Sequence, residues 1–305
     1  VEGVAEAIAI GEESGAAVQI SHHKAVGPDN WGKVRDTMAL IEAARARGVE
    51  VTVDQYPYTA SATGLSAIAP NWAHDGGTEA FLDRLRDPAT RARIRQESEE
   101  ENQRTRKGWD KVYLSFAGVP DLAHLEGKHL EEIGSIVGLP PVDAALEIIL
   151  ASKAAASQVA FGMCEEDICF VMRHPLTMAG SDAGARAPYG PLGRGKPHPR
   201  GYGTFARILG RYVREQGVLP LEEAVRKMTS LPARKLGLWD RGLLRPGMKA
   251  DIAVFHPETI IDRATFTDPH QYAAGVPYVI VNGVPVVEQG EHTGAGPGKA
   301  LRRAH

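Results

Sequence analysis

The chain alternates between short apolar stretches and segments whose apolar positions recur at helical spacing. The ranges 16–20 and 49–54 have the pattern of short buried strands, and the segment between them carries Val34, Met38 and Ile41 on one helical face. A strand, a helix and a second strand in this order predict a βαβ unit with parallel strands.

Further apolar stretches continue this pattern, and strands are expected at 112–116, 158–163 and 176–182. Residues 78–110 interrupt the series, because they are strongly charged and helical in pattern. Their charges suit a solvated helical face, so we expect an inserted helical lid between strands of an α/β barrel.

The pattern changes after residue 245. Turn residues precede a short apolar strand, and an apolar run near the C-terminus is divided by Asn282-Gly283. An Asn-Gly pair between two apolar runs is typical of a tight hairpin. We therefore expect two domains, a barrel portion at 1–245 and a small β module at 246–305.

Composition allows a substantial core and limits the partners. Of 305 residues, 43% are hydrophobic, and the formal charge is −3 with a pI near 6.4. This balance gives no basic surface for nucleic acid, and no apolar run approaches the roughly 20 residues that span a bilayer. We expect a small-molecule substrate and neither a nucleic-acid nor a membrane partner. The two cysteines, Cys164 and Cys169, form no disulfide framework, so a cytoplasmic protein is expected.

Asp182 is the strongest candidate for chemistry. It follows the apolar run 176–180, and a charge at the end of such a strand is costly unless it is paired or metal-bound. Barrel enzymes carry catalytic groups at the C-terminal ends of their strands. A loop rich in Gly, Pro, Arg and Lys follows and contains Arg200. A carboxylate facing cationic groups suits an anionic substrate and a general base, so we expect an enzyme.

Other candidates also follow predicted strands. His22 comes after the strand at 16–20 and is a candidate metal ligand, because neutral imidazole binds metals well near pH 7. Lys24 and Arg200 are suited to a carboxylate, and Tyr56 precedes a proline that keeps it extended. For each residue a structural role is the alternative: a hydrogen-bonded rim histidine, a solvated lysine or arginine, or a packed aromatic ring.

Seven short segments with distinctive residues follow one another along nearly the whole chain. They are ISHHK (20–24), DQYPY (54–58), GSD (180–182), HPRGYGTF (198–205), MTSLPA (228–233), GMKAD (247–251) and DPHQY (268–272). In order and spacing these segments resemble the N-acyl-D-amino-acid deacylases, or D-aminoacylases, of the amidohydrolase superfamily.

The resemblance implies the C-terminal part of a TIM-like (β/α)8 barrel with part of a small β-sandwich. It also implies zinc-dependent hydrolysis of N-acyl-D-amino acids to a carboxylate and a free D-amino acid. His22 matches the ligand of the tightly held zinc. Asp182 matches the general base and acid, which also touches a second metal. Lys24, Tyr56 and Arg200 match the groups that hold the substrate α-carboxylate.

The chain also departs from the family pattern. Other metal ligands of the family lie upstream of the Ser-His-x-Lys motif, whereas the 21 residues before His22 contain no His or Cys. The chain opens at Val1, without methionine, inside an amphipathic helical pattern. We therefore expect the C-terminal portion of a deacylase, inactive and poorly stable by itself.

Two alternatives stay open. One is an amidohydrolase acting on cyclic amides, of the dihydroorotase or hydantoinase type. The pair Lys24 and Arg200 favours an open-chain acylated amino acid over this alternative. The other is a non-catalytic fragment that needs a partner half.

Overall fold

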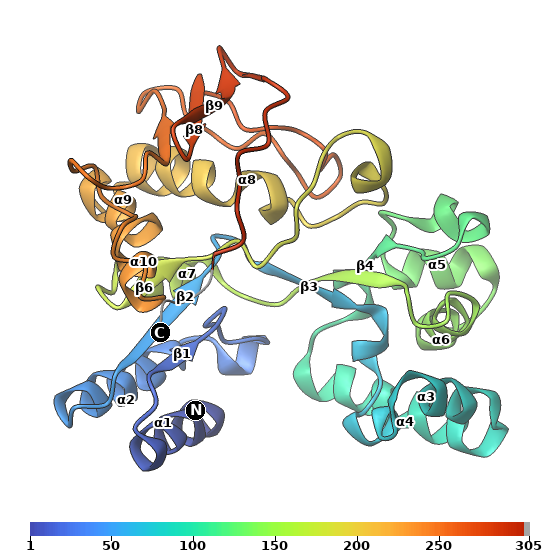
Figure 1. Ribbon diagram of the computed structural model, residues 1–305. Helices are drawn as coiled ribbons and strands as arrows, with labels where there is room; N and C mark the ends of the chain where they lie inside the picture. The colour runs from blue at the N-terminus through green and yellow to red at the C-terminus, as the bar shows by residue number, and fades with distance from the viewer. Residues whose placement is uncertain (302–305) are drawn as a thin grey trace.

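Three separate sheets organise the chain in the computed structural model, which describes residues 1–301 (Figure 1). The architecture is mixed α/β, with one parallel and two antiparallel sheets. The end of the predicted C-terminal module, residues 302–305, lies outside the described residues. Short 3-10 helices occur at Pro28–Asn30, Leu65–Ile68, Asn71–His74, Trp109–Lys111, Pro120–Leu125 and Gly190–Gly193.

The parallel sheet confirms the predicted βαβ unit. Its strands lie in the order β1-β2-β6, and helix α2 joins β1 to β2. The apolar face of α2 packs Met38 and Ile41 against Val51 and Val53 of β2. Helices α1 and α7 complete this layer. The bounds are α1 Glu2–Ser14, β1 Val18–Ile20, α2 Val34–Ala46, β2 Val51–Gln55, α7 Glu165–Arg173 and β6 Thr177–Ala179.

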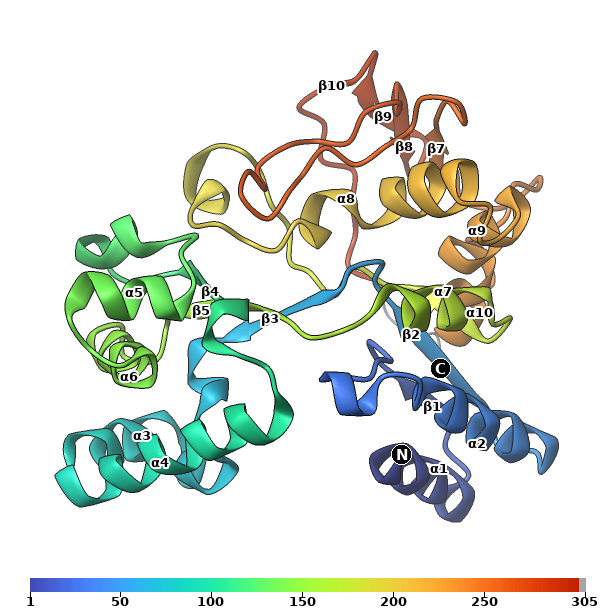
Figure 2. The ribbon, with the colours of Figure 1, turned by 180° about the vertical axis from the view of Figure 1, so that it is seen from behind.

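Residues 60–161 form an inserted unit between β2 and β6. Its strands pair antiparallel in the order β3-β5-β4, and its four helices share a core of their own with these strands. In the view from behind, these helices lie on the opposite side of β3 from the parallel sheet (Figure 2). The bounds are β3 Ala60–Gly64, α3 Gly77–Arg86, α4 Pro88–Thr105, β4 Val112–Phe116, α5 Leu130–Val137, α6 Pro141–Ala151 and β5 Ser157–Phe161.

This unit is larger than the charged stretch at 78–110, which supplies only α3 and α4. The strands expected at 112–116 and 158–163 do not continue the parallel sheet, since they pair with one another in the inserted unit. An apolar run predicts a strand but not its partner, because pairing is decided by distant parts of the chain.

No single helix among residues 1–301 is long and apolar enough to cross a membrane. Helices α5 and α6 meet that test of length and composition only as a pair, and they are bent by 84° where they join.

The C-terminal third combines helices with the second antiparallel sheet. Its strands lie in the order β10-β9-β8-β7. The predicted hairpin is confirmed, because Asn282 and Gly283 join β8 to β9 with φ values of 48° and 81°. The helix α8 continues as a π-helix, η7. The bounds are α8 Arg200–Arg207, η7 Ile208–Glu215, α9 Leu221–Met228, α10 Ser230–Lys235, β7 Ile252–Val254, β8 Tyr278–Val281, β9 Val284–Glu288 and β10 Glu291–His292.

Candidate active site

The ends of the parallel strands bring the candidate residues to one edge of the sheet. His22 and Lys24 follow β1, Tyr56 follows β2 and Asp182 follows β6. Because the strands are parallel, their carboxyl ends meet at the same edge. Arg200 joins them from the first position of α8.

Arg200 and Asp182 form the centre of this cluster. Nη1 of Arg200 lies 2.9 Å from Oδ2 of Asp182, without the alignment of a hydrogen bond. The arginine side chain is 8% exposed and the aspartate 42%, so the pair faces solvent from the carboxylate side. The guanidinium lies 4.6 Å from the ring centroid of Tyr56, and its Nη2 donates to the Ala62 carbonyl at 3.4 Å.

Lys24 approaches the same aromatic ring. Its Nζ lies 5.2 Å from the centroid of Tyr56 and donates to the His22 carbonyl at 2.7 Å. Burial lowers the pKa of Lys24 to about 8, while Asp182 acts to raise this pKa and Arg200 to lower it further. The two cations therefore lie close enough to influence one another, an arrangement that a bound anion would stabilise.

Tyr56 supplies a neutral donor between the two cations. The residue is 3% exposed, and its hydroxyl has no hydrogen-bond partner among the described residues. Burial raises the pKa of Tyr56 to about 12, so the phenol keeps its proton at neutral pH. Buried hydroxyls are normally paired, so this one is available to a ligand oxygen. Together Lys24, Tyr56 and Arg200 suit a carboxylate.

His22 and Asp182 share an uncommon backbone conformation. Their φ values are 42° and 48°, in the left-handed region that non-glycine residues seldom adopt, although His and Asp are enriched there relative to other side chains. Such conformations persist where the surrounding structure holds them, often at functional sites. They turn the chain sharply at the two strand ends that carry the metal-ligand candidates.

Asp54 holds the backbone of His22 in place, a contact that the sequence pattern does not predict. Its Oδ1 accepts from the His22 backbone N–H at 2.7 Å, and its Oδ2 accepts from Gln19 Nε2 at 2.8 Å. Asp54 is an acidic residue in a strand whose other residues are buried. A carboxylate in such a place needs hydrogen-bond partners, and this is the feature of the sequence that could have indicated its role.

A metal centre does not follow from these residues alone. Catalytic zinc usually has three protein ligands and an open position. Within residues 1–301 no group of three or more His, Cys, Asp or Glu side chains is placed to hold a metal ion. His22 and Asp182 therefore do not make a complete zinc site by themselves.

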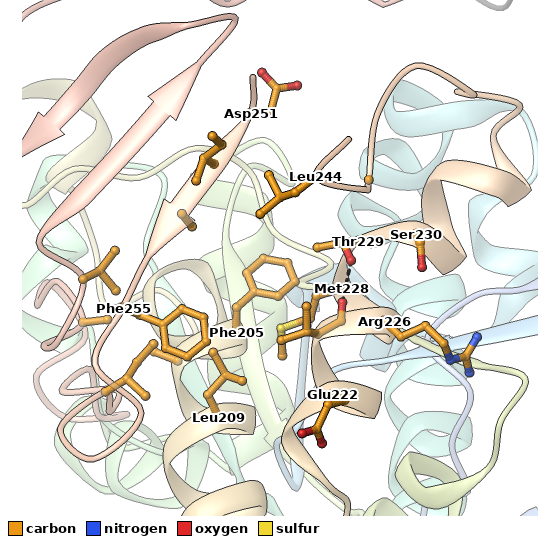
Figure 3. A pocket seen from close by; sticks show the side chains of 18 of the residues that line it. Phe205, Leu209, Glu222, Arg226, Met228, Thr229, Ser230, Leu244, Asp251 and Phe255 are labelled. Carbon is orange, nitrogen blue, oxygen red and sulfur yellow. Dashed lines mark hydrogen bonds between the residues drawn. The ribbon is translucent and has the colours of Figure 1, made fainter. Parts of the chain in front are cut away.

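A separate cavity of about 850 Å³ lies between the helices α8, η7 and α9 and the C-terminal sheet (Figure 3). Its lining is mostly apolar and includes Phe205, Leu209, Met228 and Phe255. None of the five predicted site residues lines this cavity, so the charged cluster at the strand ends is a distinct place in the fold.

Known proteins resemble the chain over most of its length. An N-acyl-D-glutamate deacylase of Alcaligenes xylosoxydans xylosoxydans is 37% identical over 300 residues, which are 98% of this chain and 51% of the relative. A D-aminoacylase of the same organism is 36% identical over 303 residues, 99% of this chain and 52% of the relative.

Solved structures show the same relationship. The crystal structure of an N-acyl-D-glutamate deacylase from Bordetella bronchiseptica, complexed with zinc and a phosphonate inhibitor, superposes with a TM-score of 0.71. It is 35% identical and is matched over 93% of this chain and 49% of its own length. The amidohydrolase-type fold is therefore confirmed, and the chain spans about half the length of the relatives it matches.

The family model for the amidohydrolase family matches residues 67–287. This range includes much of the inserted unit, all of β6 and most of the C-terminal sheet. The resemblance in the seven sequence segments is thus confirmed by sequence and structure together. The chain belongs to the amidohydrolase family.

Proposed function

We propose that this chain carries the carboxylate-binding and proton-transfer groups of an N-acyl-D-amino-acid deacylase. The observation that supports this most is the cluster of Lys24, Tyr56 and Arg200 around Asp182, assembled from four separate segments. The names of the relatives supply the substrate class, and the cluster supplies groups that suit its α-carboxylate.

Each residue has a defined task in this proposal. Arg200 and Lys24 bind the α-carboxylate by charge, and the Tyr56 phenol donates to one of its oxygens. Fixing the carboxylate orients the acyl amide next to Asp182. Asp182 accepts a proton from the attacking water and returns it to the leaving amine, which becomes the free D-amino acid.

Zinc belongs to the proposal as the cofactor, with His22 as the ligand of the tightly held ion and Asp182 touching a second one. When bound, zinc polarises a carbonyl and lowers the pKa of water. The remaining ligands would come from outside this cluster. We also propose that β1, β2 and β6 belong to a TIM-like barrel at 1–245, with 246–305 in a small β-sandwich, in a cytoplasmic enzyme.

Ligand binding tests the carboxylate site directly. Calorimetry of the 305-residue chain with N-acetyl-D-alanine, its L-enantiomer and its carboxamide should show clearly tighter binding of the D-acid than of the other two compounds. Arg200→Ala should weaken that binding about 100-fold, because it removes charged hydrogen bonds. Equal affinity for the acid and the carboxamide would contradict the assignment.

Hydrolysis tests the reaction. The N-terminal half of the Alcaligenes D-aminoacylase can be fused before Val1, loaded with zinc and assayed for D-alanine release. We expect hydrolysis of N-acetyl-D-alanine and none of dihydroorotate or a hydantoin. If a folded, zinc-containing fusion cleaves only the cyclic amides, the deacylase assignment is wrong and the chain belongs to an enzyme that acts on cyclic amides.

A further inference from the structure

His198 lies buried behind the candidate site and has a fixed hydrogen-bonding pattern. The residue is 5% exposed. Its Nε2 lies 2.9 Å from the carbonyl oxygen of Ala60, and its Nδ1 lies 3.0 Å from the backbone nitrogen of Arg200. A carbonyl only accepts and a backbone N–H only donates, so the ring carries its proton on Nε2 and none on Nδ1.

Aromatic rings surround this imidazole. The ring centroids of Tyr58 and Phe266 lie 5.0 Å from it and that of Tyr56 lies 5.9 Å away, each in an edge-to-face arrangement. Burial lowers the pKa of His198 to about 3, so the ring stays neutral under ordinary conditions. A neutral ring enclosed by aromatic side chains is not suited to exchange protons with a substrate. Its role must then lie in the neighbours that it holds in position.

The first neighbour is Arg200 itself. This residue opens α8, and the first N–H groups of a helix have no partner within the helix. Nδ1 of His198 accepts the Arg200 N–H and satisfies that donor. The imidazole therefore fixes the backbone from which the carboxylate-binding side chain begins.

The second neighbour is β3, an edge strand of the inserted unit. His198 donates to the carbonyl of Ala60, and Arg200 donates through Nη2 to the carbonyl of Ala62. The segment 198–200 is thus attached to β3 at two points, one through the imidazole and one through the guanidinium. These contacts join residues 138 apart in the sequence.

We propose that His198 is a positioning residue, which fixes the start of α8 against β3 and so aims the Arg200 guanidinium at the substrate carboxylate. The inference depends on the proposed function in one respect, the role of Arg200 as a carboxylate ligand. A role in packing alone would change the binding of every ligand alike, whereas positioning acts on the carboxylate specifically.

Two variants separate these roles. His198→Asn keeps an acceptor where Nδ1 stands and loses the donor to Ala60, and His198→Leu removes both. We expect Leu to weaken N-acetyl-D-alanine binding about tenfold, which is about the net effect of one neutral hydrogen bond, and Asn to recover most of the loss. Binding of the weakly held carboxamide should change less than twofold.

His74 provides the matched control, because its imidazole stacks on Phe81 at 4.5 Å within the inserted unit, away from the cluster. His74→Leu should leave the binding of N-acetyl-D-alanine unchanged. If His198→Leu weakens the acid and the carboxamide equally, or if Asn is no better than Leu, the positioning role is wrong.

Nuclear magnetic resonance decides the inference even if the wild-type chain binds no N-acyl-D-amino acid, which would be a failure of the proposed function. Imidazole ¹⁵N shifts should show the proton on Nε2 from pH 7 to pH 5. Exchange of the Arg200 backbone amide should be slow in the wild type and in His198→Asn, and faster in His198→Leu. A proton on Nδ1, or equal exchange in all three proteins, would overturn the proposal.

Discussion

The inserted unit and the parallel sheet enclose their interiors to very different degrees. In the inserted unit, strands β4 and β5 and four helices surround one continuous core that includes Leu114, Ile133 and Leu146. In the parallel sheet, β1 is only half-buried along its length, and α1 buries only Ile8 and Gly11. The candidate chemistry lies on the less enclosed region, while the better packed region holds β3 against Arg200. Within the described residues, the more continuous core and the candidate chemistry therefore lie in different regions.

The largest effect should come from Asp182. In the zinc-loaded fusion, Asp182→Asn should slow D-alanine release by about 10²- to 10⁴-fold, because the amide cannot accept and return the proton. The matched change Asp121→Asn, at an exposed position of the inserted unit, should leave the rate unchanged. A similar loss of rate in both variants would contradict the placement of the catalytic group in the parallel-sheet region.

The packing difference can be tested with matched leucines. Leu114→Ala, at a fully buried position of β4, should lower the free energy of unfolding by about 2–5 kcal/mol. Leu176→Ala, at a half-buried position before β6, should cost clearly less, since part of this side chain already contacts water. Urea unfolding measures both. Equal costs would contradict the comparison.

Low pH should destabilise the fold through His198, which connects α8 to the inserted unit. An unfolded histidine takes up a proton below about pH 6.5, whereas the pKa of His198 is about 3 in the folded chain. The unfolded state then binds more protons between these values, so stability falls as pH drops. After normalisation at pH 7.5, His198→Gln should be more stable than the wild type by about 3 kcal/mol at pH 4. Parallel stability–pH curves would mean that His198 titrates normally.

The smallest effect should come from the charged outer face of α4. Arg104 pairs with Glu101, and the two side chains are 73% and 55% exposed. Exposed ion pairs contribute little, so Arg104→Ala should change the free energy of unfolding by less than about 0.5 kcal/mol. A loss of more than about 1 kcal/mol in the free energy of unfolding would contradict the exposed position of this ion pair.

Local patterns in the sequence predicted local structure well. The βαβ unit and the Asn282-Gly283 hairpin are confirmed, because helix spacing and turn chemistry depend on nearby residues. The structure also brings Lys24, Tyr56, Asp182 and Arg200 together, as strand ends on one edge of a sheet suggested. The roles of these four residues stay predictions.

Distant pairings could not be predicted in the same way. The strands β4 and β5 looked like further members of the parallel series, since an apolar run does not specify its partner. The contacts of Asp54 and His198 were also missed. His198 meets a carbonyl 138 residues away, and only the assembled fold shows that its ring faces Ala60 rather than a metal or substrate.

The left-handed backbone at His22 and Asp182 limits how these positions can vary by mutation. Glycine and asparagine adopt positive φ most readily, so they are the replacements that the backbone accepts best. Both remove the imidazole or the carboxylate. A replacement that keeps a carboxylate, such as Asp182→Glu, places a longer side chain on a backbone that disfavours it. Histidine and aspartate are themselves among the non-glycine residues that tolerate positive φ best, so the backbone narrows the choice at these two strand ends to a few residue types, among which selection for activity would choose histidine and aspartate.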